Sequence, residues 1–302
     1  MTDFRALLAD IGVPRLVGTP SHGRVRERLK SELQARGFVV MEHHFSRRSL
    51  LYRFGRTPLD GVNLIAVRPR ARIATWLTAH YDSKGQPLSM AFRLVAAGLA
   101  ALGVVELASV SLRALFGALV LGAGDFLLGM AALVGVALLA ANPVTDKSAG
   151  AVDNATGVLT VLAIVDALPP SAGLGVIFTD AEEYGLVGAR AIARERANLL
   201  AETAVVNFDG IDDRGRSVAF VHRPGPMVDA VVRDTDARGW RRLPVLVDGI
   251  AFGRAARECV TIMRGGWATA RIVHTSRDTV ERLTLEGVGQ VAQGVAAALF
   301  PR

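Results

Sequence analysis

The chain has 302 residues, of which 51% are hydrophobic, and this length suits one large α/β domain or two small ones. Its formal charge of +7 is compatible with an anionic partner such as a lipid surface. No basic tract is interleaved with aromatic residues, so we expect no nucleic-acid binding. Cys259 is the single cysteine, which excludes intrachain disulfides and a thiolate-rich zinc site. Any metal ion would be held by His, Asp and Glu.

The N-terminal residues do not follow the pattern of a secretion signal. "MTDFRALLADIGVPRLVGTP" has acids and a proline where a signal peptide needs a basic stretch followed by an apolar run. The lack of disulfides is also typical of a reducing compartment. We therefore expect the catalytic part of the protein in the cytoplasm.

Strand and helix patterns alternate through most of the chain. An amphipathic helix over 21–38 precedes strands at 38–45, 61–68 and 72–80. The later part of the chain continues with a helix at 153–168, a strand at 174–180, a helix near 187–200, strands at 204–210 and 217–221, a helix near 226–238, a strand near 259–263 and a helix near 284–299. This alternation predicts an α/β fold with a mixed, mostly parallel central sheet and helices on both faces.

One stretch interrupts the alternation. Residues 88–142 are almost continuously apolar and carry charge only at Arg93, Glu106, Arg113 and Asp125. We interpret 85–147 as an apolar insertion into a single domain formed by residues 1–84 and 148–302, which together have an ordinary domain size.

The insertion is long enough for two membrane-spanning helices. A span needs about 20 mainly apolar residues, and the stretch offers roughly 90–111 and 114–141. A hairpin would return the chain to the side it left, so we expect the lipid bilayer as a partner of 88–142 and the cytoplasmic membrane as the location. A helical lid or a dimer interface is the alternative, because Glu106 and Asp125 are costly in lipid, and the protein would then be soluble in the cytoplasm.

Acidic and histidine side chains follow the predicted strands or begin the helix after the insertion. They are His80, Asp82, Asp153, Glu182, Glu183, Asp209 and His274. The carboxyl ends of parallel strands share one edge of a sheet, where ligands bind. The sequence therefore predicts that these side chains gather at one edge.

These residue types suit two zinc ions. Such ions lie about 3.5–4 Å apart and need one carboxylate to bridge them. Asp153, short and placed at a helix N-terminus, suits the bridge. His80 and Asp209 would complete one set of ligands, and Glu183 and His274 the other.

This assignment leaves Glu182 without a metal. Consecutive side chains diverge, so Glu183 can bind an ion while its neighbour faces the water between the metals. We predict that Glu182 is the general base that takes a proton from this water.

The segments "TAHYDSKG", "AVDNATGVLTVL", "TDAEEYGLVGAR", "NFDG" and "VHTSRDT" together resemble the M28 family of di-zinc peptidases, the aminopeptidase and glutamate-carboxypeptidase-like group. The resemblance covers roughly 1–84 and 148–302. It implies a zinc-exopeptidase-like fold, two zinc ions per chain, a peptide substrate and the metal ligands given above. It also implies that Asp82 orients the His80 imidazole.

Two departures from the family pattern bear on substrate specificity. The apolar insertion stands where the family usually has a short loop between its first His and its bridging Asp. The stretch "VDGIAFGRAARECV" resembles an Asp-His-x-x-Phe segment, but Gly249 stands where His is common.

The expected function is that of a zinc-dependent exopeptidase, and specifically an aminopeptidase. A glutaminyl-cyclase-like acyltransferase that uses one zinc ion is a second hypothesis. A non-catalytic membrane-bound receptor or scaffold on a peptidase fold is a third, although a scaffold would not need Glu182. Manganese and cobalt accept the same ligands as zinc, and no sequence feature indicates an oligomeric state.

Overall fold

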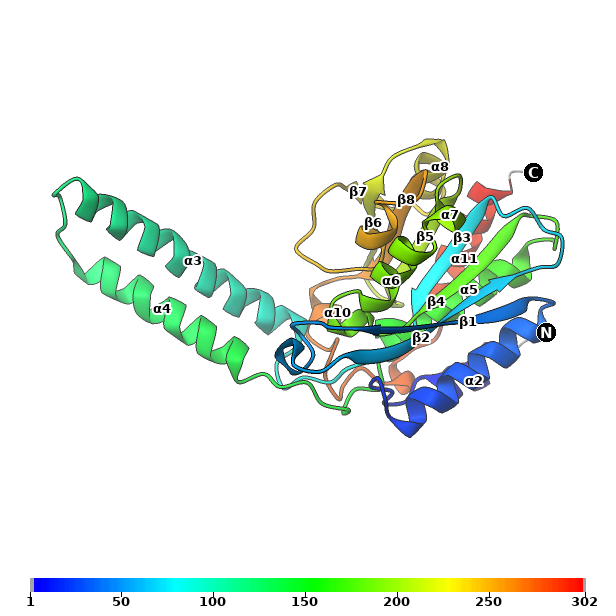
Figure 1. The fold of residues 1–302 in the computed structure, drawn as a ribbon, viewed down its shortest axis with the longest axis horizontal. Helices are drawn as coiled ribbons and strands as arrows, with labels where there is room; N and C mark the ends of the chain where they lie inside the picture. The colour runs from blue at the N-terminus through cyan, green and yellow to red at the C-terminus, as the bar shows by residue number, and fades with distance from the viewer. Residues whose placement is uncertain (1–2, 301–302) are drawn as a thin grey trace.

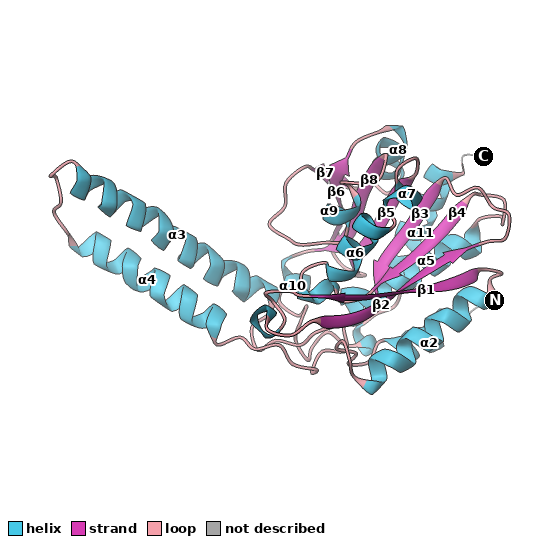
Figure 2. Ribbon diagram, viewed as in Figure 1, coloured by secondary structure: helices cyan, strands magenta, loops and turns pink. Residues whose placement is uncertain are grey.

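An eight-stranded sheet forms the centre of the computed structural model, which describes residues 3–300 (Figures 1 and 2). The strands are β1 (Val39–Arg47), β2 (Leu59–Val67), β3 (Thr75–His80), β4 (Leu174–Thr179), β5 (Ala204–Ile211), β6 (Arg216–Arg223), β7 (Arg238–Trp240) and β8 (Glu258–Gly265). Their order is β1-β2-β4-β3-β5-β8-β6-β7. β4, β3, β5 and β8 are parallel neighbours, whereas β1, β2 and β6 join antiparallel. The predicted mixed α/β sheet is confirmed.

Helices cover both faces of this sheet. They are α1 (Phe4–Ile11), α2 (Pro20–Ala35), α5 (Thr156–Ala167), α6 (Val187–Glu195), α7 (Ala197–Leu200), α8 (Pro226–Asp234), α9 (Gly249–Phe252), α10 (Trp267–Ala270) and α11 (Glu286–Leu299). One core contains side chains of α1, α2, α5, α8 and α11, and a smaller core on the other face contains those of α6, α7 and α9. Successive residues of β3 serve the two cores, since Trp76 packs in the smaller and Leu77 in the larger.

Two further helices, α3 (Met90–Leu115) and α4 (Ala123–Ala140), project away from the sheet as a long antiparallel hairpin (Figure 1). Each is long and apolar enough to cross a membrane. The sequence predicts their junction near residues 111–114, but α3 continues to Leu115. The chain reverses over 116–122, where Gly117 has a φ of +67° that glycine adopts without strain.

The two segments that connect the hairpin to the domain run side by side. Gly85 and Thr145 exchange backbone hydrogen bonds, of 2.7 Å from Gly85 and 2.8 Å from Thr145. A β-carbon at Gly85 would lie 2.8 Å from Thr145 Oγ1, so only glycine permits this close approach. The hairpin therefore begins and ends at one place, next to His80 and the segment that leads to Asp153.

Candidate metal centre

Parallel pairing brings the predicted site residues to one edge of the sheet. β3 ends at His80, β5 carries Asp209 near its end, and β4 leads into the 3-10 turn Glu182–Tyr184. Asp153 lies in the turn 151–155 just before α5. All these site side chains are buried or nearly so.

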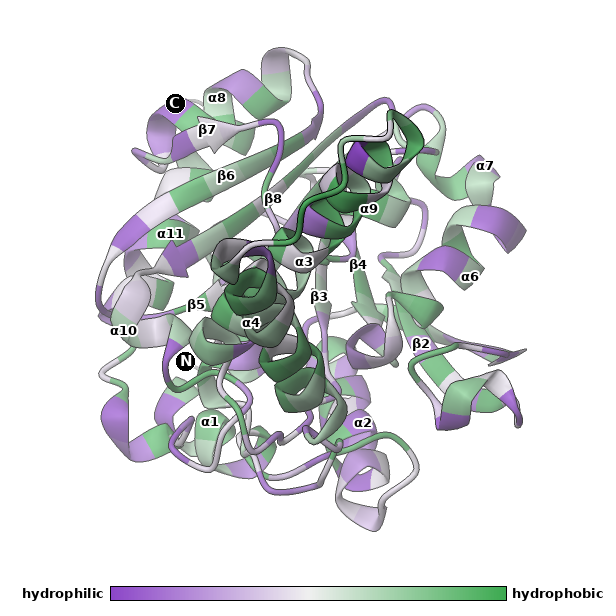
Figure 3. Ribbon diagram, turned by 90° about the vertical axis from the view of Figure 1, so that its left-hand side faces the viewer, coloured by the Kyte–Doolittle hydropathy of each residue, from purple (hydrophilic) through white to green (hydrophobic). Residues whose placement is uncertain are grey.

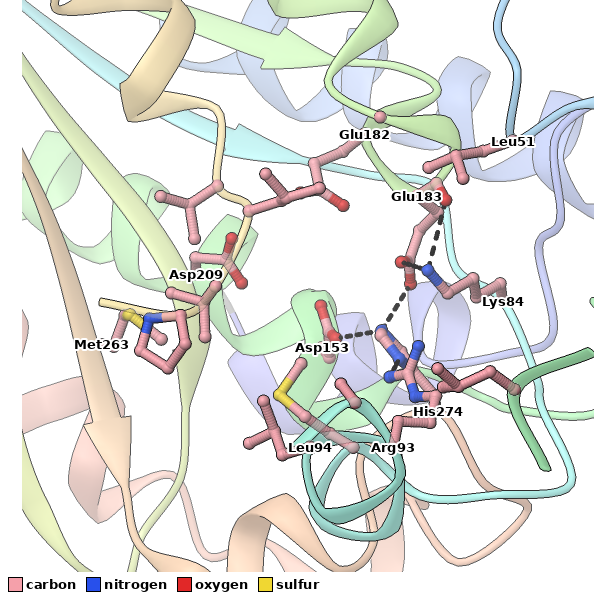
Figure 4. A pocket seen from close by; sticks show the side chains of 18 residues that line it. Leu51, Lys84, Arg93, Leu94, Asp153, Glu182, Glu183, Asp209, Met263 and His274 are labelled. Atoms are coloured by element: carbon pink, nitrogen blue, oxygen red, sulfur yellow. Dashed lines mark hydrogen bonds and ion pairs between the residues drawn. The ribbon is translucent and has the colours of Figure 1, made fainter. Parts of the chain in front are cut away.

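Asp153 lies between the two histidines. Its Oδ1 is 3.1 Å from His80 Nε2. Its Oδ2 is 2.8 Å from His274 Nε2, as Figure 4 shows. Asp209 Oδ1 lies 3.9 Å from His80 Nε2, and Glu183 Oε1 lies 3.1 Å from His274 Nε2. Two clusters result, each with ligand atoms within 4.8 Å of one another, and Asp153 belongs to both. This is the arrangement that a bridging carboxylate between two metal ions requires.

The donor atoms of both clusters fit zinc, which accepts imidazole nitrogen and carboxylate oxygen. Glu183 Oε1 is buried and accepts no hydrogen bond of good geometry from the described residues, although His274 Nε2 lies 3.1 Å away. A buried carboxylate oxygen without a well-placed donor is costly in a protein interior, and a cation would satisfy it. His80 and Asp209 in one cluster, Glu183 and His274 in the other, and Asp153 in both would hold the two ions.

Glu182 lies outside both clusters but close to them (Figure 4). Burial raises the pKa of its carboxyl well above the ordinary value, and the charges of Glu183, Asp209 and Asp248 raise it further, while His80 opposes them. A carboxyl group with a raised pKa accepts and returns a proton more readily near neutral pH. The position of Glu182 therefore suits proton transfer rather than metal binding.

Asp82 has two sets of contacts. Its backbone oxygen is 3.2 Å and its Oδ1 is 3.4 Å from His80 Nδ1, which leaves Nε2 free for a metal. Its carboxylate also accepts the backbone N–H groups of Glu182 at 3.1 Å and Glu183 at 3.2 Å. Of these contacts, only the one with the histidine is predicted from the sequence.

Two residues that the sequence analysis did not assign to the site hold its turns. Asp278 accepts the backbone N–H of Val152 at 2.8 Å and that of Asp153 at 3.2 Å. Arg15 is fully buried and donates to the carbonyls of Tyr81 at 2.6 Å and Gly150 at 2.9 Å. Arg15 thus ties the segment after β3 to the segment before Asp153. No feature of the sequence pointed to Arg15. Asp278 could have been found, because it lies only four residues after the candidate ligand His274.

Two cations contact the cluster that contains His274. Lys84 Nζ lies 2.8 Å from Glu183 Oε2 and donates to the Glu183 carbonyl at 3.2 Å. Arg93, in the first turn of α3, donates to His274 Nδ1. The hairpin therefore reaches the candidate metal centre directly.

The space beside Gly249 explains one departure from the family pattern. A β-carbon there would lie 2.2 Å from Thr261 Oγ1 and 2.3 Å from His222 Nε2. His222, on β6, hydrogen-bonds Thr261 at 2.8 Å and fills this space. Any larger residue at 249 would collide with the His222 ring.

A pocket of about 330 Å³ lies over the metal centre. Asp153, Glu182, Glu183, Asp209 and His274 line its floor. Its walls come from the hairpin and from two loops: Met90, Leu94, Ala97 and Leu139 on α3 and α4, Leu51 before β2, and Pro244, Val245, Leu246 and Val247 before α9. The helices that leave the domain are thus part of the wall above the candidate site.

The mixed sheet and the edge cluster define an α/β protein that has the fold of zinc exopeptidases and carries a candidate metal centre. Residues 63–299 match peptidase family M28, and the chain belongs to this family. No curated protein sequence matches the chain.

Solved structures resemble the chain over almost its whole length. A Zn-dependent exopeptidase from Parabacteroides distasonis is 19% identical with a TM-score of 0.66, and the match covers 99% of this chain and 97% of that one. A glutaminyl cyclase from Porphyromonas gingivalis is 16% identical with a TM-score of 0.65, over 98% and 96%. The LapA aminopeptidase of Legionella pneumophila is 14% identical with a TM-score of 0.59, over 98% and 71%. At these identities the likeness concerns the fold.

Proposed function

We propose that the protein is a zinc-dependent aminopeptidase that removes residues from the free amino end of peptides. The observation that carries this proposal is the position of Asp153, whose two carboxylate oxygens face the two histidines separately at 3.1 and 2.8 Å. Membership of peptidase family M28 supports the same reaction class.

Each residue of the site would have a separate role in hydrolysis. Zinc ions held by the two clusters would lower the pKa of a water molecule and polarise the peptide carbonyl. Glu182 would accept the proton of that water and pass it to the departing amine, which is why its side chain lies beside the metal ligands and not among them. Asp82 would fix both the His80 imidazole and the turn that carries Glu182.

One observation favours a second function, a glutaminyl-cyclase-like acyl transfer with a single zinc ion. Lys84 and Arg93 place two positive charges against Glu183 and His274. Positive charge reduces the attraction of that cluster for a second dication. In this case His80, Asp153 and Asp209 would hold the single ion.

Hydrolysis of a peptide panel by the purified, zinc-loaded protein tests the proposal. The panel pairs each free aminoacyl peptide with its N-acetylated form and includes an N-terminal glutaminyl peptide. Release of the first residue from free peptides only, with two zinc ions per chain, is expected. Cleavage at the carboxyl end would refute the aminopeptidase assignment, and pyroglutamate formation with one zinc ion would establish the second function.

A further inference from the structure

We propose that α3 and α4 cross a lipid bilayer as a hairpin and hold the candidate active site at its surface, so that the substrates are peptides whose free amino terminus lies at the membrane interface. The substrate half of this inference rests on the proposed function, whereas the membrane half does not.

Most residues of both helices are hydrophobic (Figure 3), and many of their large apolar side chains are exposed. Val104 is 70% exposed, Phe126 is 69% exposed and Leu133 is 61% exposed. Only 6% of the most apolar window of each helix is buried. A helical lid buries one face against its protein, but these helices contact mainly each other. Contiguous apolar surface of this extent marks an interaction site, and lipid covers all sides of a hairpin at once.

The charged residues of the hairpin lie at distances that match a bilayer. Arg93 at the base and Arg113 near the tip are 20 positions apart, which is about 30 Å of α-helix and the thickness of the hydrocarbon core. Arg113 forms ion pairs with Asp125 and, at 3.2 Å, with Glu106. Arg113 and Asp125 lie near the far interface, whereas Glu106 lies seven positions before Arg113 and thus about 10 Å inside it. Its ion pair with Arg113 makes it less costly there than an unpaired charge.

Three segments around the base of the hairpin form a surface that we call the collar: residues 47–58, 240–247 and 266–277. In Figure 1 they lie at the end of the domain from which the hairpin departs, and α10, within the third segment, packs against α3. Large apolar side chains are exposed on each segment: Leu50, Leu51, Phe54, Trp240, Leu246 and Trp267. Eight exposed arginines accompany them: Arg47, Arg48, Arg53, Arg56, Arg241, Arg242, Arg271 and Arg277.

The collar segments contain no acidic residue. Exposed arginines next to exposed aromatic and aliphatic side chains are complementary to an anionic leaflet, whose phosphates attract the charges while the apolar groups enter the interface. This chemistry points to anionic lipid as the partner of the collar.

The distribution of basic residues also gives the orientation of the hairpin in the membrane. Lys84, Arg93 and Lys147 flank its base, whereas Arg113 is the only basic residue near its tip. The positive-inside rule then places the catalytic domain on the cytoplasmic side.

The pocket over the metal centre opens within this surface. Leu51 and Leu246 of the collar line it together with Met90, Leu94 and Leu139 of the hairpin. A collar that rests on lipid places the mouth of the pocket in the headgroup layer. A peptide anchored in the same bilayer is confined near this mouth, so its amino terminus reaches the site at a high effective concentration.

Membrane extraction of the full chain tests the hairpin. The wild type should stay in the membrane pellet after an alkaline carbonate wash and should need detergent for release. Leu133→Asp places a charge in the apolar middle of α4, eight positions after Asp125, and should lower the pelleted fraction about tenfold. Val39→Asp is the matched control, because Val39 is also exposed but lies on β1 of the domain. A wild-type protein that is monodisperse in buffer without detergent, as a monomer or as a dimer, would overturn the membrane hairpin.

Reconstituted vesicles test the substrate class. The protein in phosphatidylcholine vesicles, with or without phosphatidylglycerol, receives two peptides of one sequence, of which one carries an acyl anchor at its carboxyl end. The anchored peptide should be hydrolysed with a kcat/KM at least about tenfold higher. The double variant Arg241→Glu/Arg242→Glu should lose this preference in anionic vesicles. The double variant Arg70→Glu/Arg72→Glu is the control, since these exposed arginines lie between β2 and β3, at the opposite edge of the sheet.

The two proposals fail in different ways. Equal kcat/KM for both peptides would overturn the interfacial substrate and leave the peptidase intact. No hydrolysis of either peptide by the zinc-loaded protein would refute the proposed function and the substrate half with it. The extraction result decides the membrane half in either case.

Discussion

The carboxylate of Asp82 accepts the backbone N–H of Glu182 at 3.1 Å. Its other oxygen accepts the N–H of Glu183 at 3.2 Å, so one buried acid fixes the turn that presents both glutamates. Glu183 lies in a candidate metal cluster and Glu182 lies outside it. This difference therefore depends on the turn that Asp82 holds, as well as on the divergence of two consecutive side chains.

Asp82→Asn tests this dependence. Asparagine offers one carbonyl oxygen where aspartate offers two, so one of the two N–H groups loses its acceptor. Changes of this kind next to metal ligands cost about 10–100-fold in activity or metal affinity. Steady-state kinetics with metal analysis should show a fall in kcat that exceeds any fall in bound zinc. A variant with wild-type kcat would contradict the positioning role.

Glu182→Gln should abolish turnover while the metal content stays at the wild-type level. Glutamine has the shape of glutamate but cannot accept the proton, and loss of a general base costs about 10²–10⁴-fold in rate. Elemental analysis and hydrolysis of a reporter peptide measure the two effects separately. Glu183→Gln provides the contrast, because it should lower zinc binding. If Glu182→Gln lost zinc, the roles of the two glutamates would have to be exchanged.

Asp153→Asn should weaken the binding of both metal ions, whereas His80→Ala and His274→Ala should each empty mainly one site. The reason is that Asp153 belongs to both clusters and each histidine to one. Zinc titration of the three variants gives the stoichiometry. Equal loss of a single ion in all three variants would remove Asp153 from the bridge.

The strands that carry the site could be predicted because each is an apolar run that ends in a polar residue. The expected strand at 72–80 corresponds to β3, which ends at His80, and the expected strand at 204–210 corresponds to β5 with Asp209. The antiparallel places of β2 and β6 could not be predicted, since strand pairing depends on contacts between residues far apart in the chain. Helix α1 was not predicted either, although Asp3 accepts the N–H groups of Arg5 and Ala6 at its start.

The grouping of the candidate metal ligands could be predicted from their residue types and their positions at strand ends. The residues that hold these ligands in place could not. Arg15 interacts with carbonyl oxygens, which every residue has, so no side-chain pattern indicates its partners. The contact between Arg93 and His274 depends on where the hairpin leaves the domain. The sequence indicated that the insertion is apolar, but not that its first turn forms a wall of the pocket.

Arg15→Met should destabilise the domain and loosen the metal centre. The guanidinium satisfies the carbonyls of Tyr81, Gly150 and, at 3.1 Å, Val13, and methionine fills the space without any donor. Each buried carbonyl left without a partner costs about 1–3 kcal/mol. Chemical unfolding in detergent should show the loss of stability, and the zinc affinity should fall with it. Arg24→Met, at an exposed position of α2, is the control that should leave both quantities unchanged.

The stability of the domain should depend on pH through His222. Burial lowers the pKa of this imidazole from 6.5 to about 4, because the folded protein holds it in the neutral form. Well above pH 6.5 the ring is neutral in both the folded and the unfolded protein. As the pH falls toward 4, the imidazole binds a proton in the unfolded chain but stays neutral in the folded domain. The free energy of unfolding should therefore drop by up to about 3 kcal/mol. His222→Gln keeps a hydrogen-bonding group beside Thr261 but does not titrate. The unfolding free energies of wild type and variant should be measured from pH 8 to about pH 4. As the pH falls, the wild type should lose more stability than the variant. A difference between the two that is independent of pH would contradict the buried neutral histidine.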